Sequence, residues 1–117
     1  MSPQTIRIMM LTPFLMLTSC TSQNTVEYLG FEGCPNTPEL RERLVVAKPD
    51  IHIIDVNLMA LEAGDVRLGW GAPTILFGGE DLFDEPASNN GSVSCRNWGG
   101  GLPSVEEIRE QFRKQSR

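Results

Sequence analysis

The sequence predicts one α/β domain with a four-stranded mixed sheet, built in the order strand, helix, strand, helix, strand, strand, helix. Its length of 117 residues leaves room for a single domain. Runs of β-branched and aromatic residues alternate with an amphipathic segment, which is typical of two parallel strands joined by a helix. A pair of glycines between the last two runs predicts a hairpin, so the final two strands are expected to be antiparallel.

The N-terminal residues 1–19 are predicted to be a signal peptide that lies outside this domain. Arg7 precedes an apolar run over residues 8–17, and small residues follow the run. The run is about half of the ~20 residues that a membrane-spanning helix needs, and Pro13 interrupts it. We therefore expect the segment to direct secretion without spanning a membrane permanently.

Residues 17–20, Leu-Thr-Ser-Cys, resemble the lipobox of bacterial lipoproteins. The resemblance implies that Cys20 carries a lipid anchor, that the signal is cut before it, and that residues 20–24 form the lipidated cysteine and a tether. It also implies a location at the cell membrane or outer membrane, on the periplasmic or extracytoplasmic face, where Thr21 mildly favours the outer membrane. An ordinary signal peptide with a coincidental cysteine is the alternative.

The domain is predicted to span residues 25–117 and to begin with a strand over residues 25–31. A helix over residues 35–47 follows, and Asn36 or Thr37 is expected to cap it. Its spacing places three apolar side chains on one face, namely Leu40, Leu44 and Val45.

The second strand is predicted over residues 51–57. This run is apolar on both faces apart from His52 and Asp55, as expected of a strand that is covered on both sides. A lone histidine in such a run is interpreted as an ordinary strand residue and not as a ligand. A short helix over residues 58–63, ended by glycine, is predicted next. A loop over residues 68–73 then leads to a third strand over residues 74–77.

Gly78 and Gly79 turn the chain into a fourth strand over residues 80–83, and a long loop over residues 84–101 follows. The acidic residues of the hairpin and its exit are expected to be solvated, namely Glu80, Asp81, Asp84 and Glu85. Ser104 and Glu107 are predicted to form a capping box at the start of the last helix. The apolar face of this helix carries Val105, Ile108 and Phe112.

The element order resembles the thioredoxin fold over about residues 25–117. Cys34 directly follows the first strand and opens the first helix, where that superfamily places its attacking cysteine, and Pro73 precedes the third strand, where it places a cis-proline. Four short motifs are also similar to those of small bacterial thioredoxin-like proteins, some of which carry selenocysteine: residues 31–36, 73–74, 94–96 and 101–108. The chain departs from the superfamily at residues 34–37, where Cys-Pro-Asn-Thr replaces Cys-x-x-Cys.

The resemblance implies a partner-binding groove beside Cys34. A cis bond at Pro73 turns the preceding backbone outward, so that Ala72 pairs with an extended partner peptide. Two tryptophans flank the loops that approach the cysteine, and Trp70 is a candidate for the rim of this groove. Anchoring of those loops to the core is the alternative role for Trp70 and Trp98.

Cys34 is the candidate nucleophile because the positive end of a helix dipole lowers the pKa of a thiol from its ordinary value of ~8.5. Thr37 stands one helical turn away and is expected to donate its hydroxyl to the thiolate. Cys95 is interpreted as the resolving cysteine, which swings in from the long loop and closes a disulfide. The same bond as a permanent structural disulfide remains an open alternative.

These observations predict a membrane-anchored thioredoxin-like lipoprotein that engages in thiol–disulfide chemistry through Cys34 and Cys95, with a protein thiol or a small thiol as partner. The alternatives are a non-catalytic binding or structural lipoprotein with a permanent disulfide, and capture of a thiophilic metal by the two thiols. No cofactor and no zinc site are predicted, because two cysteines and one histidine lack close metal spacing. Fifteen acidic residues against ten basic ones, with a net charge of −5, argue against a nucleic-acid binder.

Overall fold

The computed structural model describes residues 24–88 and 91–115 and shows a small α/β domain with a four-stranded mixed sheet and two helices. The elements are β1 (Thr25–Gly30), α1 (Asn36–Ala47), β2 (His52–Asn57), the 3-10 turns η2 (Leu58–Ala60) and η3 (Val66–Gly69), β3 (Thr74–Phe77), β4 (Glu80–Asp81) and α2 (Val105–Gln115). This order confirms the sequence prediction, except that two 3-10 turns replace the predicted second helix.

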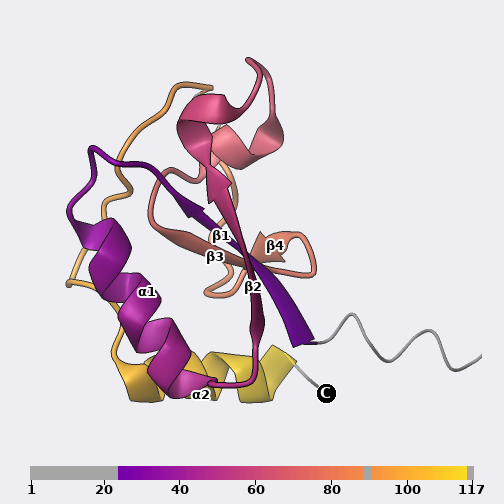
Figure 1. Cartoon of the computed structure of the whole chain (residues 1–117), viewed down its shortest axis with the longest axis vertical. Helices are drawn as coiled ribbons and strands as arrows, with labels where there is room; N and C mark the ends of the chain where they lie inside the picture. The colour runs from indigo at the N-terminus through magenta and orange to yellow at the C-terminus, as the bar shows by residue number, and fades with distance from the viewer. Residues whose placement is uncertain (1–23, 89–90, 116–117) are drawn as a thin grey trace, which may run out of the picture.

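The sheet has the strand order β2-β1-β3-β4, with α2 at the bottom and the segment of η2 and η3 at the top of the molecule in Figure 1. Strand β1 pairs in parallel with β2, from Thr25 opposite His52 to Gly30 opposite Asn57. It pairs in antiparallel fashion with β3, which in turn forms the predicted hairpin with β4. The parallel first pair and the antiparallel last pair are therefore confirmed.

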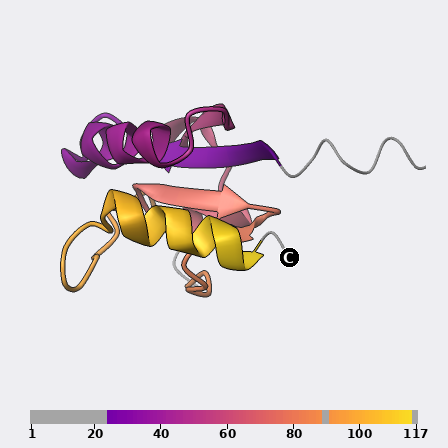
Figure 2. The same ribbon diagram turned by 90° about the horizontal axis from the view of Figure 1, so that it is seen from below.

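Both helices pack on one face of the sheet. Figure 2 shows α1 on the side of β1 and α2 on the side of β3. Phe112 of α2 contacts Phe77 of β3 edge to face, with ring centroids 5.2 Å apart. The buried core of this face comes from strands and helices alike and includes Val26, Tyr28, Leu40, Leu44, Ile75, Ile108 and Phe112.

The opposite face is covered by the segment that carries η2 and η3. Leu58 and Leu68 from these turns are buried against Leu29, Ala72 and Leu76. Asn57 and Asp65 cap the two turns by accepting hydrogen bonds from the backbone of Met59 and Arg67. The core therefore has two layers, one on each face of the sheet, and Ala72 of the loop that leads to β3 is buried in the second layer.

The structure corrects two predictions about burial. Strand β2 is the edge of the sheet, and four of its six residues are exposed, so it is not covered on both sides. His52 is among the exposed residues, as expected of an ordinary strand position. On α1, Val45 is exposed and Ala47 is buried in its place, because Ala47 continues the helical spacing of Leu40 and Leu44 whereas Val45 lies beside that face.

The helix starts differ in how they are capped. Ser104 and Glu107 form the predicted capping box, in which each side chain accepts a hydrogen bond from the other residue's backbone N–H. Helix α1 has Pro35 at its cap position and no side-chain cap, so the predicted capping by Asn36 or Thr37 is wrong. In the first turn of α1, the Thr37 N–H instead donates to the backbone carbonyl oxygen of Cys34.

The predicted signal peptide 1–19 and the lipidated Cys20 lie outside the described residues, as does most of the tether 20–24. Within the ranges that the structure does describe, no helix is both long and apolar enough to cross a membrane.

Candidate functional site

The site is centred on the Cys34 thiol at the junction of β1 and α1. The Cys34 backbone N–H donates to the carbonyl oxygen of Phe31 at 3.2 Å, and its carbonyl accepts from the N–H of Thr37 at 3.1 Å. These two bonds form the tight connection from strand to helix. The side chain is only 2% exposed, and its thiol donates to the carbonyl oxygen of Ala72 at 3.4 Å.

Cys95 approaches the same place from the long loop. The Ala72 N–H donates to the carbonyl oxygen of Ser94 at 2.9 Å, and the Arg96 N–H donates to the carbonyl oxygen of Ala72 at 2.7 Å. Residues 94–96, which we call the Cys95 segment, thus form a one-residue parallel bridge with Ala72. The bridge brings the exposed Cys95 thiol close to the Cys34 thiol.

The hydrogen bond with Cys34 raises the pKa of the Cys95 thiol above its ordinary value. We expect Cys34→Ala to lower the pH midpoint at which Cys95 reacts with iodoacetamide, because the bond that favours the protonated form is lost. The contact stabilises the fold while Cys95 holds its proton, and that contribution fades as the pH rises through the raised pKa. Mass spectrometry of the alkylated peptide measures the midpoint. An unchanged midpoint would show that the two thiols do not interact in solution.

A buried ion pair holds the Cys95 segment in place. The Arg96 guanidinium donates twice to the Asp81 carboxylate, at 3.0 Å each, and once to the Thr74 hydroxyl at 3.1 Å. Only 9% of the Arg96 side chain and none of the Asp81 side chain is exposed. Asp81 therefore has a structural role in the hairpin, and the prediction that it is solvated is wrong.

Trp98 adds a second attachment beyond the ion pair. Its ring lies 3.7 Å from the Arg96 guanidinium carbon and meets the Phe83 ring edge to face. Its indole N–H donates to the carbonyl oxygen of Pro73 at 3.2 Å. The side chains of Arg96 and Trp98 thus attach the loop around Cys95 to the hairpin and to Pro73. Its backbone attaches it to Ala72, just before β3.

Gly71 permits the close approach of the Cys95 segment. Its φ is +77°, and a Cβ there would lie 3.0 Å from the Ser94 carbonyl oxygen and 3.2 Å from the Arg96 nitrogen. Gly79 has a similar φ of +83° but nothing within 4 Å of a Cβ, so it serves as a matched control.

We expect Gly71→Ala and Gly79→Ala to lose comparable stability from backbone strain, about 1–3 kcal/mol each. Only Gly71→Ala is expected to slow disulfide formation between Cys34 and Cys95, because only there does the added methyl group push the two segments apart. Urea denaturation gives the stability, and the rate of thiol loss under a mild oxidant gives the second quantity. Equal rates in the two variants would contradict the role assigned to Gly71.

The structure differs from the sequence prediction in how the two cysteines meet. The Cys95 segment already lies against Ala72, so no swing of the loop is needed to bring the thiols together. The Ala72–Pro73 bond is cis, as the resemblance implied. However, both backbone polar groups of Ala72 are bonded to the Cys95 segment, in the position that was predicted for a partner peptide.

Thr37 and Trp70 take other roles than those predicted. The Thr37 hydroxyl makes no hydrogen bond with any residue that the structure describes, so it does not donate to Cys34; its methyl group packs on Gly30 instead. The Trp70 indole N–H donates to the carbonyl oxygen of Glu85 at 2.7 Å, which anchors the loop after β4. Trp70 also lines a shallow cleft of about 530 Å³ that Arg96 and Trp98 share.

A second cleft of about 510 Å³ opens beside Cys34 on the α1 side. We call it the Cys34 cleft, and its walls include Tyr28, Phe31, Cys34, Thr37, Pro38 and Val56. Arg41 and Asp55 also line it and form a two-bond ion pair at 2.9 and 2.7 Å. No local sequence pattern indicates this cleft, because its residues are spread over two strands and a helix.

No group of three or more potential metal-ligating side chains occurs in the part of the chain that the structure describes. In comparisons with known proteins, no protein-family model, no curated protein and no solved structure matches this chain.

Proposed function

We propose that this protein is a membrane-anchored thioredoxin-like lipoprotein that exchanges disulfides through Cys34 and Cys95. The observation that carries the proposal is the close approach of the two thiols, which both lie against the backbone of Ala72. A reversible dithiol needs two sulfurs that meet without rearrangement of the fold. The bridge to Ala72 and the buried Arg96–Asp81 pair provide that arrangement.

The thioredoxin-like assignment is part of the same proposal. It is supported by the strand order β2-β1-β3-β4, by a cysteine between β1 and α1, and by the cis bond before β3. Residues 34–37 read Cys-Pro-Asn-Thr, so helix α1 carries no second cysteine at the position where Cys-x-x-Cys has one. In this protein Cys95 supplies that thiol from the other side of Ala72.

The proposed exchange consumes one disulfide and releases two thiols. Cys34, having given up its proton, attacks one sulfur of a disulfide R–S–S–R; a Cys34–S–R bond forms, and the first thiolate leaves and takes up a proton. Cys95 then attacks the Cys34 sulfur, and the second R–S⁻ leaves with the proton that Cys95 gave up. Cys34 and Cys95 are oxidised to a disulfide, and the substrate is reduced to two R–SH.

A trapping experiment tests the proposal directly. In the full chain carrying Cys20→Ala, the further change Cys95→Ser is expected to accumulate a mixed disulfide on Cys34 when a small disulfide is added, because the second attack is missing. With both cysteines present, the intramolecular disulfide is expected instead. Peptide mass mapping distinguishes the two products. A mixed disulfide that persists with Cys95 present, or no reaction at Cys34, would overturn the proposal.

The membrane anchor at Cys20 belongs to the proposal and follows from the lipobox resemblance of residues 17–20. Each methylene of an acyl chain contributes about 0.8 kcal/mol to membrane affinity, so the anchor would hold the domain at the bilayer surface. We expect labelled palmitate to enter the wild-type protein in bacteria and not to enter Cys20→Ala. Equal labelling of both proteins would contradict the anchor.

A further inference from the structure

We propose that the Cys34 cleft binds a small, largely apolar organic disulfide without negative charge and presents it to Cys34. This inference rests on the proposed thiol–disulfide exchange and assigns the class of its substrate. It distinguishes a small molecule from a polypeptide, which the resemblance had implied as one possible partner.

The peptide-binding position beside Cys34 is already occupied by the Cys95 segment. An extended peptide would need the N–H and carbonyl groups of Ala72, which donate to Ser94 and accept from Arg96. The Cys95 segment that occupies this position is secured by the buried Arg96–Asp81 pair. A polypeptide would have to break both attachments before it could reach Cys34.

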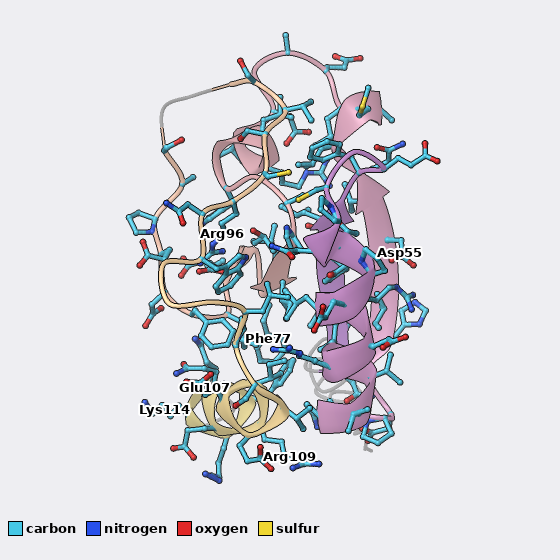
Figure 3. All side chains as sticks on the ribbon, turned by 90° about the vertical axis from the view of Figure 1, so that its left-hand side faces the viewer. Asp55, Phe77, Arg96, Glu107, Arg109 and Lys114 are labelled. Carbon is cyan, nitrogen blue, oxygen red and sulfur yellow. The ribbon has the colours of Figure 1, made fainter. Side chains whose placement is uncertain are left out.

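Access to the buried Cys34 thiol is through the Cys34 cleft. Cys34 is 2% exposed and is covered on one side by Ala72 and the Cys95 segment, yet it forms part of the wall of the Cys34 cleft. Figure 3 shows Arg96 and Asp55 on opposite sides of the molecule, with α1 between their labels. The cleft therefore approaches Cys34 from the side away from the ion pair that fixes Cys95.

The walls of the Cys34 cleft also indicate which class of ligand it can bind. A volume of about 510 Å³ is within the range of small-molecule sites. Tyr28, Phe31, Pro38 and Val56 supply apolar or aromatic surface, and the Tyr28 hydroxyl is already used, since it donates to the Thr37 carbonyl at 2.5 Å. These walls suit an apolar body better than a charged peptide.

The polar side chains in the walls of the Cys34 cleft narrow the ligand class further. The charges of Arg41 and Asp55 offset one another, and the Arg41 guanidinium keeps the pKa of the Asp55 carboxyl below its usual range, so the pair stays intact at neutral pH. Glu32 also lines the cleft and forms no ion pair with any other described residue, so the unbalanced charge there is negative and disfavours an anionic ligand. The Thr37 hydroxyl oxygen is buried and has no hydrogen-bond partner among the described residues, so the cleft wall contains a polar group that the described fold does not satisfy.

The test compares two disulfide probes on the reduced full chain carrying Cys20→Ala. Dithiodipyridine is small, aromatic and uncharged at neutral pH, whereas oxidised glutathione is peptidic and charged. Each rate constant for Cys34 is divided by that of free N-acetylcysteine with the same probe, which removes the difference in intrinsic reactivity. We expect the normalised rate to favour dithiodipyridine by about tenfold or more, as apolar burial of one ring predicts.

Two valine variants separate the cleft from general effects. Val56→Phe fills the cleft and is expected to remove most of the preference, while Val66→Phe enlarges an exposed valine outside it and is expected to leave the preference unchanged. The carbon analogue dipyridylethane, which cannot react, is expected to shift the NMR signals of Phe31 and Val56 in the wild type and to have a weaker effect in Val56→Phe.

The outcomes distinguish this inference from the proposed function. If Cys34 reacts with both probes at equal normalised rates, or if Val66→Phe and Val56→Phe act alike, the small-molecule site is wrong and the exchange chemistry stands. If Cys34 reacts with neither probe, or if no Cys34–Cys95 disulfide follows, the proposed function fails and takes the inference with it. A preference for dithiodipyridine that only Val56→Phe removes supports both.

Discussion

The change Arg96→Met is expected to lower the free energy of unfolding by about 3–5 kcal/mol, because it leaves a buried carboxylate without its partner. The Asp81 side chain is fully buried and receives two of its hydrogen bonds from Arg96. Methionine retains the length of the side chain, so the loss is mainly electrostatic. Urea denaturation of the reduced protein measures the change.

A matched control comes from the exposed ion pair on the other side of the molecule. Arg41 makes the same two-bond contact with Asp55, but the two side chains are 40% and 58% exposed. Arg41→Met is therefore expected to change the stability by less than about 1 kcal/mol. Arg96→Met should also slow the closure of the Cys34–Cys95 disulfide. Equal, small losses in both variants would show that the Arg96–Asp81 pair does not hold the Cys95 segment.

Oxidation of Cys34 and Cys95 is expected to raise the free energy of unfolding by about 4 kcal/mol, the chain-entropy value for a disulfide that encloses 60 residues. The thiols already lie close together in the fold, so the bond should close with little rearrangement. Urea denaturation with and without a reductant, in the Cys20→Ala background, gives the difference. The control Cys95→Ser should show no dependence on the reductant, and a loss of stability on oxidation would contradict the geometry.

Local patterns in the sequence predict most of the elements. The glycine pair at residues 78–79 places the hairpin between β3 and β4, and the capping box at Ser104 places the start of α2. These signals act within a few residues, so they do not depend on the rest of the fold. The predicted helix after β2 is less regular in the structure, because Asn57 caps a 3-10 turn of three residues and the chain then turns away.

Long-range packing accounts for the features that the sequence did not predict. The run over β2 is apolar enough for a central strand, but no further strand pairs with its outer edge among the described residues, so it is exposed. Asp81 follows a glycine turn, which usually indicates solvation. Its burial depends on Arg96, fifteen residues further along the chain. No local pattern connects these two residues.

The candidate site was predicted in part. The position of Cys34 and the identity of Cys95 as its partner were available from the sequence, because few residue types have this chemistry. The contact of the Cys95 segment with Ala72 was not, since it depends on two backbone hydrogen bonds that the sequence does not specify. That contact changes the expected partner, because it places the protein's own chain where a peptide was predicted.

The most direct test of the dithiol account is an equilibrium redox titration of the full chain in the Cys20→Ala background. The protein is incubated with mixtures of reduced and oxidised dithiothreitol, acid-quenched, alkylated and weighed by mass spectrometry. The account predicts a single reversible two-electron transition in which Cys34 and Cys95 lose and regain their thiols together, and its absence in Cys34→Ser and Cys95→Ser. Independent oxidation of the two cysteines, or two thiols that remain reduced at every ratio, would contradict it.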